Sequence, residues 1–285
     1  MRAERPVEPA PARPPLILVF DSGLGGLSVF RELARARPDA AFAYAADDAG
    51  FPYGRLDEPV LLSRVLAVVG ALVAQLQPAA VVIACNTAST LVLPALRARH
   101  AIPFVGTVPA IKPACEGSLS RRVSVLATPG TVKRDYTQGL IRDFAGGCAV
   151  TLVGATGLAG LAEAVMAGAE VPDAAFATEI APAFVDDGAA RTDTVVLACT
   201  HYPLVLERLE KVAPWPVRWV DPAPAIARRL SSLIAPPERS ADPAPLALFS
   251  TGQPLDAALI ARVVGRPARA GEVIGLDHAM VSASA

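Results

Sequence analysis

The chain has few of the residues that mark metal sites, disulfide frameworks or nucleic-acid-binding surfaces. It contains four cysteines and three histidines among 285 residues, and no CxxC or Cys/His spacing predicts a metal or redox site. In a chain of this size, scattered cysteines indicate reduced thiols, so we expect a cytoplasmic protein. The net charge of -1 at pH 7 predicts no interaction with nucleic acid or an anionic membrane.

Long hydrophobic runs are also missing. The composition is 53% hydrophobic, yet no apolar run approaches the ~18–20 residues that cross a bilayer, so we expect no membrane span. The first apolar run, Leu16 to Phe20, is too short for the core of a secretory signal. With 285 residues, the chain is long enough for two domains or one large α/β domain with a substantial core.

Short apolar runs alternate with helical patterns through the first part of the chain. This alternation predicts right-handed βαβ crossovers and a mainly parallel sheet. The expected strands are Leu16–Phe20, Ala41–Ala46, Val81–Ala84 and Pro103–Thr107, and the expected helices are Leu27–Arg37, Glu58–Gln77 and Ser89–Arg99.

The same order then begins again. The expected strands are Val123–Ala127, Ala149–Val153, Val195–Ala198 and Val217–Val220, with helices from about Lys133, over about Leu158–Asp186 and from near Leu204. We read this as an internal repeat. It predicts an α/β protein with two similar doubly wound domains, mainly parallel sheets and an active site in the cleft between them.

The repeat also suggests domain limits. We expect the second domain over residues 111–217, and the first over residues 16–110 together with about 218–285. The C-terminal stretch holds helical segments and one strand-like run, Leu246 to Ser250. Residues 1–15 are rich in Pro, Ala, Arg and Glu without periodicity, which predicts a disordered tail.

Two of the buried-strand patterns end in the same dipeptide, Ala-Cys. Cys85 follows one and Cys199 the other, at the strand ends where open α/β sheets place their ligands. Each thiol precedes polar residues and an expected helix, whose N-terminus would lower the thiol pKa from about 8.5 toward neutrality. Singly, either cysteine could be a small buried apolar residue, which is how we interpret Cys115 and Cys148.

Other polar residues stand at strand ends. Asp21 opens the Gly-rich turn Asp21-Ser22-Gly23-Leu24-Gly25-Gly26, whose backbone N–H groups could hold an anion. A dinucleotide fingerprint with Asp47 as ribose contact fits less well, because Ser28 replaces the third glycine. His201, two positions after Cys199, is a candidate for proton transfer or carboxylate binding. Glu163 alone would be read as a solvated helix residue.

Taken together, these motifs resemble the glutamate racemases of bacteria, within the aspartate/glutamate racemase superfamily. The resemblance covers about Leu16 to Asp221. It rests on Phe20–Val29, Pro52-Tyr53-Gly54, Cys85-Asn86-Thr87-Ala88-Ser89, Thr128-Pro129-Gly130-Thr131 and Cys199-Thr200-His201-Tyr202-Pro203.

The resemblance implies racemisation of L- and D-glutamate without a cofactor or metal, for peptidoglycan synthesis, in a cytoplasmic homodimer. It implies catalytic roles for Cys85, Cys199, Asp21, His201 and Glu163. The implied substrate-binding residues are Asp21, Ser22, Pro52, Tyr53, Gly54, Cys85, Asn86, Thr87, Thr128, Cys199, Thr200 and His201. The family usually has a Cys-Pro pair before the glutamate, where this chain has Ala155-Thr156.

Three other functions stay open on the sequence. The substrate could be aspartate or another acidic amino acid. A thiol hydrolase or transferase could use Cys85 as nucleophile and His201 as base, which leaves Cys199 unexplained. A non-enzymatic amino-acid-binding protein on the same scaffold is the third, although intact cysteine, aspartate and histidine positions count against it.

Overall fold

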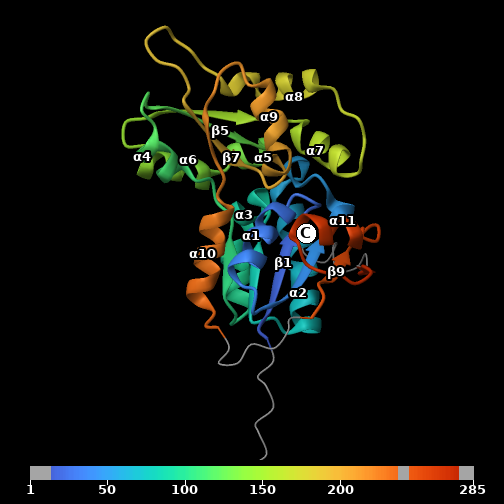
Figure 1. The fold of residues 1–285 in the computed structure, drawn as a ribbon. Coiled ribbons are helices and arrows are strands. Elements are labelled where there is room, and N and C mark those ends of the chain that lie inside the picture. Colours follow the sequence, from blue (N-terminus) through green and yellow to red (C-terminus); the bar gives the residue numbers. More distant parts are fainter. Residues whose placement is uncertain (1–13, 237–243, 276–285) are drawn as a thin grey trace, which may run out of the picture.

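The structure is a computed structural model that describes residues 14–236 and 244–275 of the chain. Most of the expected N-terminal tail, residues 1–13, lies outside the described residues. Figure 1 shows two α/β units, one above the other. The C-terminal segment returns to the lower unit and lies beside the strands of the N-terminal segment.

The larger sheet has six parallel strands in the order β10-β9-β2-β1-β3-β4. Nearly every residue of the central strands is buried, because helices cover both faces. Its strands are β1 (Leu16–Asp21), β2 (Ala41–Ala46), β3 (Ala80–Ile83), β4 (Phe104–Gly106), β9 (Ala247–Ser250) and β10 (Glu272–Val273).

Two hydrophobic clusters fill the faces of this sheet. Alternate residues of β1 point to opposite sides, so Ile17 and Val19 belong to one cluster and Leu18 and Phe20 to the other. One face packs against α1 (Leu27–Ala36), α10 (Ala223–Leu233) and α11 (Ala257–Val264), and the other against α2 (Glu58–Leu76) and α3 (Asn86–Arg99). We call this part of the chain the large-sheet region.

The smaller sheet has four parallel strands in the order β6-β5-β7-β8. They are β5 (Arg122–Ala127), β6 (Ala149–Gly154), β7 (Thr194–Ala198) and β8 (Arg218–Val220). One face packs against α4 (Ile111–Gly117) and α6 (Asp135–Phe144), and the other against α7 (Leu158–Met166), α8 (Asp173–Ile180) and α9 (Leu206–Val212). This is the small-sheet region.

Short helical turns complete the two regions. They lie mostly in the loops that follow strands. They are η1 (Asp48–Gly50), η2 (Tyr53–Arg55), α5 (Pro129–Val132), η3 (Ala181–Ala183) and η4 (Tyr202–Val205).

The two sheets repeat one strand order. The order β2-β1-β3-β4 in the large sheet matches β6-β5-β7-β8 in the small one. Cys85 follows β3 and Cys199 follows β7, which are equivalent strands. The predicted fold class, with its repeat and parallel sheets, is therefore confirmed.

Several predicted boundaries need correction. The helix after Cys85 begins at Asn86 instead of Ser89. After Cys199 the chain first forms the 3₁₀ turn η4, and α9 begins at Leu206, two residues after the predicted start near Leu204. The strand-like run near the C-terminus is β9, which pairs with β2. Propensity alone places helix ends poorly.

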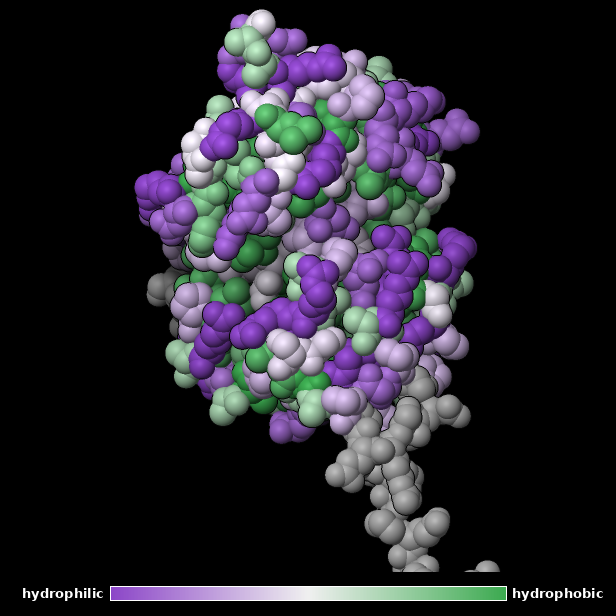
Figure 2. Space-filling model, turned by 60° about the vertical axis from the view of Figure 1, so that its left-hand side comes forward, coloured by the Kyte–Doolittle hydropathy of each residue, from purple (hydrophilic) through white to green (hydrophobic). Residues whose placement is uncertain are grey.

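The sequence predicted no segment long and apolar enough to span a membrane, and helix α2 shows that this was wrong as a statement about length and composition. Its 19 residues are long and apolar enough to cross a bilayer by length and composition. The sequence argument counted only uninterrupted runs, and the polar Ser63 and Arg64 divide this one. One face of α2, including Leu61, Val65 and Leu72, is buried against the sheet, as in the core helix of a globular protein. On the face of the molecule in Figure 2, hydrophilic and hydrophobic residues are interspersed.

Candidate active site

The carboxyl ends of β1, β3, β5 and β7 converge on a small cavity between the two regions. Its volume is about 20 Å³, which is room for about one water molecule. Of the twelve residues that the sequence assigned to substrate binding, all but Asp21 line it. The lining residues are Ser22, Phe51, Pro52, Tyr53, Gly54, Cys85, Asn86, Thr87, Thr128, Ala159, Cys199, Thr200 and His201.

Cys85 enters the cavity from the N-terminal end of α3 in the large-sheet region. Its side chain is buried, and its Sγ lies 3.8 Å from the Ser22 hydroxyl. Burial raises the Cys85 pKa, and the nearby Asp21 charge raises it further, although the Ala88 N–H acts in the opposite direction. The expectation of a lowered pKa was therefore wrong for Cys85, because the loss of water outweighs the helix terminus.

Cys199 enters from the small-sheet region and has a different partner. Its Sγ lies 3.7 Å from Nδ1 of His201, whose Nε2 lies 2.7 Å from Oε1 of Glu163. Burial lowers the His201 pKa, but the contacts with Cys199 and Glu163 outweigh it, and the pKa lies well above the usual value. An imidazolium can donate from Nδ1 to the sulfur and from Nε2 to the carboxylate. The proximity of Glu163 to His201 shows that this glutamate is more than a solvated helix residue.

Asp21 lies next to the cavity and is fully buried. Its Oδ1 accepts the N–H of Gly23 at 3.0 Å, and its Oδ2 accepts the Thr200 hydroxyl at 3.1 Å. Burial raises the Asp21 pKa from 3.8 to about 6, against the lowering effect of His201 and these hydrogen bonds. This carboxyl group can therefore change protonation state near neutral pH.

The Gly-rich turn after β1 packs against the small-sheet region. The N–H of Leu24 donates to Glu163 Oε1 at 2.6 Å, and the N–H of Gly25 approaches His201 Nε2 at 3.2 Å. A Cβ on Gly25 would lie 2.4 Å from the His201 ring, and one on Gly23 would lie 2.3 Å from Glu163. The turn therefore uses its N–H groups for side chains of the opposite region, and glycine permits that close approach.

The Gly25 contact also bears on the protonation of His201. Nε2 can donate to Glu163 when the ring is an imidazolium, and it can accept from Gly25 when it carries no proton. The two neighbours thus favour different protonation states of one ring. Such an arrangement suits a group that gains and loses a proton.

Asp47 supports one wall of the cavity and is itself enclosed. The Tyr53 hydroxyl donates to its Oδ2, the Arg64 guanidinium binds both oxygens at 2.5 and 2.6 Å, and Thr251 donates to Oδ1 at 2.5 Å. Since Asp47 has no exposed surface, its carboxylate is fully occupied within the protein. A ribose contact, the weaker alternative on the sequence, has no support here.

Asn86 presents polar atoms that the protein leaves without partners. It is 2% exposed, and among the described residues neither Oδ1 nor Nδ2 has a hydrogen-bond partner. Burying an amide in this state is unfavourable by about 1–3 kcal/mol. Beside it, the hydroxyls of Thr87 and Thr128 contact one another at 2.9 Å. This wall is suited to a polar ligand.

Phe51 and Ala159 also line the cavity, and the sequence did not single them out. The Phe51 ring lies 5.4 Å from the His201 ring in a tilted arrangement. Its position before Pro52-Tyr53-Gly54 was a usable signal. Ala159 on α7 carries no chemical signal that sequence reasoning could have found.

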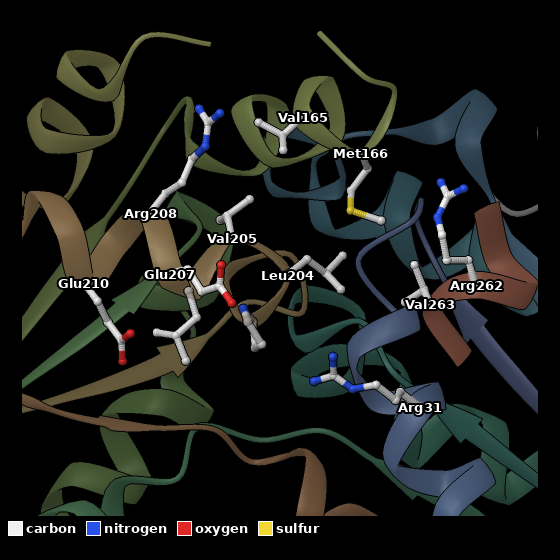
Figure 3. A pocket seen from close by; sticks show the side chains of 12 residues that line it. Arg31, Val165, Met166, Leu204, Val205, Glu207, Arg208, Glu210, Arg262 and Val263 are labelled. Atoms are coloured by element: carbon white, nitrogen blue, oxygen red, sulfur yellow. The ribbon is translucent and has the colours of Figure 1, made fainter. Parts of the chain in front are cut away.

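A larger cavity of about 610 Å³ lies outside this site. Figure 3 shows Arg31 of α1 and Arg262 of α11 on one side, with Val165 and Met166 of α7 above them. Neither Cys85 nor Cys199 lines it, so its size does not make it the reaction site. Within residues 14–236 and 244–275, no group of three or more His, Cys, Asp or Glu side chains is placed to hold a metal ion.

Two thiols stand at equivalent strand ends of two repeated sheets. Comparison with known protein families identifies a class of enzyme for this chain. The profile of the family described as Asp/Glu/Hydantoin racemase matches residues 26–230, and the chain belongs to this family.

Its similar relatives narrow the class to one enzyme. The chain is 57% identical over 226 residues to the glutamate racemase of Brucella ovis, covering 79% of this chain and 81% of the relative. The Escherichia coli glutamate racemase, solved in complex with L-glutamate and the activator UDP-MurNAc-ala, is 41% identical. It superposes with a TM-score of 0.79 over 88% of this chain and 94% of its own. The glutamate racemase of Aquifex pyrophilus is 28% identical with a TM-score of 0.69, over 89% and 96% of the two chains.

Proposed function

We propose that this protein is a glutamate racemase that interconverts L- and D-glutamate by proton transfer between two thiols, and that D-glutamate is supplied to peptidoglycan synthesis. The observation that carries the mechanism is the pair Cys85 and Cys199, which line one cavity from opposite regions. The glutamate racemases among its relatives support the choice of substrate.

Racemisation without a cofactor needs an acid/base group on each face of the α-carbon. One thiolate removes the α-proton, and the other thiol returns a proton to the opposite face. The roles reverse for the other enantiomer. The contacts pair Cys199 with His201 and place the Asp21 charge near Cys85, so we assign each thiol its own proton-exchange partner.

The rest of the site is suited to bind the amino acid. The Asn86 amide and the N-terminal end of α3 can hold the α-carboxylate, where negative charge develops as the proton leaves. We assign binding roles also to Ser22, Tyr53, Gly54, Thr87, Thr128 and Thr200. Glu163 acts through His201, because it contacts that ring and does not line the cavity.

The cavity is too small for an amino acid, so binding requires its walls to separate. We propose that the two regions form two domains, residues 16–110 with about 218–285 and residues 111–217, each with its own hydrophobic clusters. Closure over the substrate would exclude water and strengthen the polar contacts. We also keep a cytoplasmic homodimer as a proposal, from the family resemblance.

The hydrolase alternative loses support. Its base, His201, contacts Cys199 and not the supposed nucleophile Cys85.

The test is to follow the circular dichroism of L-glutamate, D-glutamate and L-aspartate with the purified protein and no added pyridoxal phosphate. In D₂O, both glutamate enantiomers should lose their signal to zero, and deuterium should enter the α-carbon. If the protein converts aspartate faster than glutamate, aspartate is its substrate and the proposed specificity for glutamate is wrong. Ligand binding without α-proton exchange would contradict racemisation and support a binding protein.

A further inference from the structure

Ser28, which occupies the position of the third glycine in the turn motif, contacts the opposite region. It lies in the first turn of α1 and is 1% exposed. Its Oγ is 2.7 Å from the carbonyl oxygen of Thr200 and 2.9 Å from that of Gly25. A hydroxyl has one proton to donate, and the shorter contact is the one that joins the two regions.

The acceptor belongs to the residue between Cys199 and His201. This loop has two further contacts with the large-sheet region. The Thr200 hydroxyl donates to Asp21 at 3.1 Å, and the Gly25 N–H approaches the His201 ring. Those two contacts involve side chains of the loop. Ser28, by contrast, donates to the loop's backbone, at the peptide between Cys199 and His201.

The loop at Cys85 is held differently. There, the Ser89 hydroxyl donates to the carbonyl of Ile83 at 2.7 Å and accepts the N–H of Thr107 at 3.0 Å. All of these residues belong to the large-sheet region. The backbone at Cys85 thus receives this side-chain support from its own region, whereas the backbone at Cys199, besides its own turn bonds, receives it from a serine of the other region.

We propose that Ser28 is a positioning residue for the Cys199 face, and that its hydrogen bond to Thr200 aligns Cys199 and His201 only when the two regions are closed. This inference rests on the proposed two-thiol racemisation. Without the hydroxyl, the buried Thr200 carbonyl loses a donor, and the loop no longer has one fixed orientation. Proton transfer at Cys85 is unaffected.

The test is Ser28→Ala, with kinetic isotope effects measured separately on L- and D-glutamate deuterated at the α-carbon. We expect kcat/KM to fall by about tenfold, equally in both directions, because the enantiomers have the same free energy. The isotope effect on kcat/KM should rise for the enantiomer whose proton is removed at Cys199. It should fall for the other, because return of the proton at Cys199 then limits the rate.

A matched control is Ser124→Ala, which removes a buried serine hydroxyl that donates to the Ala183 carbonyl at 2.6 Å, away from the cavity. It should leave both isotope effects unchanged. If Ser28→Ala does not fold, Ser28→Cys, with a similar shape and a weaker donor, should shift the isotope effects in the same opposed directions.

The outcomes separate this proposal from the proposed function. Wild-type protein without α-proton exchange would overturn the racemase. A racemising wild type, with a Ser28 variant whose two isotope effects stay unchanged or move together, would overturn only the role of Ser28.

Discussion

The two thiols occupy equivalent places in the repeat but have different surroundings. Cys85 lies beside the Ser22 hydroxyl and the Asp21 charge, while Cys199 contacts the imidazole of His201. The sheets supply the same strand end in both regions. The chemical difference between the two thiols comes from the groups around each of them, several of which the Gly-rich turn holds by reaching across the cleft. A symmetric fold thus produces an asymmetric site.

Removing each thiol in turn should have the largest effect. Cys85→Ala and Cys199→Ala should each lower kcat for racemisation by at least about 10³-fold, since each change removes the acid/base of one face. Circular dichroism of both glutamate enantiomers measures this. Cys115→Ala and Cys148→Ala, which change thiols outside the cavity, should retain activity within about twofold. Substantial racemisation by Cys85→Ala or Cys199→Ala would rule out a mechanism with two thiol bases.

Gly25→Ala tests whether the closeness of the two regions produces the asymmetry. The new Cβ would lie 2.4 Å from His201 Nδ1 and 2.6 Å from the Thr200 hydroxyl, so the Cys199 loop must shift. We expect kcat/KM to fall by about 10²-fold. The control is Gly70→Ala in α2, where a Cβ has no neighbour within 4 Å; it should raise stability by up to about 1 kcal/mol. If Gly25→Ala were as active as Gly70→Ala, the close contact between Gly25 and the Cys199 loop would not matter for activity.

Asp21→Asn should separate stability from activity on the Cys85 side. The folded pKa of Asp21, about 6, lies above its usual 3.8, so the folded protein binds this proton more tightly than the unfolded chain. Stability from this group is present below about pH 4 and is lost as pH rises to about 6. The loss is about 3 kcal/mol above that range.

Urea unfolding of the wild type and Asp21→Asn measures this loss. The variant should be more stable than wild type at pH 7.5 and equally stable near pH 4. Its kcat/KM should be about tenfold lower than that of the wild type and should no longer decrease below about pH 6. A variant that is less stable at pH 7.5 would show that the charged carboxylate is favourable.

Glu163→Gln should have the smallest effect and should change mainly the Cys199 side. Glu163 helps to raise the His201 pKa, so its loss should lower that pKa and move the alkaline limb of the kcat/KM profile to lower pH. We expect about a threefold fall in activity at pH 8, because the contact with Cys199 still raises the His201 pKa. The Glu163 charge also raises the Asp21 pKa as its smallest contribution, so the acid limb near pH 6 should move only slightly to lower pH. A shift of the acid limb as large as that of the alkaline limb would mean that the two thiols share one titrating network.

The sequence predicted the strands, the internal repeat and nearly all of the cavity lining, because β-branched runs and strand-end polar residues are local signals. The order of the strands within each sheet, β2-β1-β3-β4 and β6-β5-β7-β8, became visible only in the structure. The Cys85 pKa could not be predicted, because the burial that raises it depends on the packing of elements that are distant in the sequence. The same holds for the Glu163–His201 contact, which joins α7 to the loop after β7. The turn from Asp21 to Gly26 was interpreted as a candidate anion site, whereas its Leu24 and Gly25 N–H groups contact Glu163 and His201, which lie 139 and 176 positions away in the sequence.

The return of the chain to the large sheet has a consequence for biosynthesis. Strand β9 pairs with β2, and Thr251 directly after it donates to Asp47, which holds Tyr53 of the cavity wall. A ribosome therefore completes the small-sheet region before it has made the last strands of the large one. Until then, the edge of β2 is unpaired and exposed to other chains. We expect nascent chains, or chains cut before β9, to lack a finished site and to depend on chaperones, so that the protein acquires its activity only after β9 has been made.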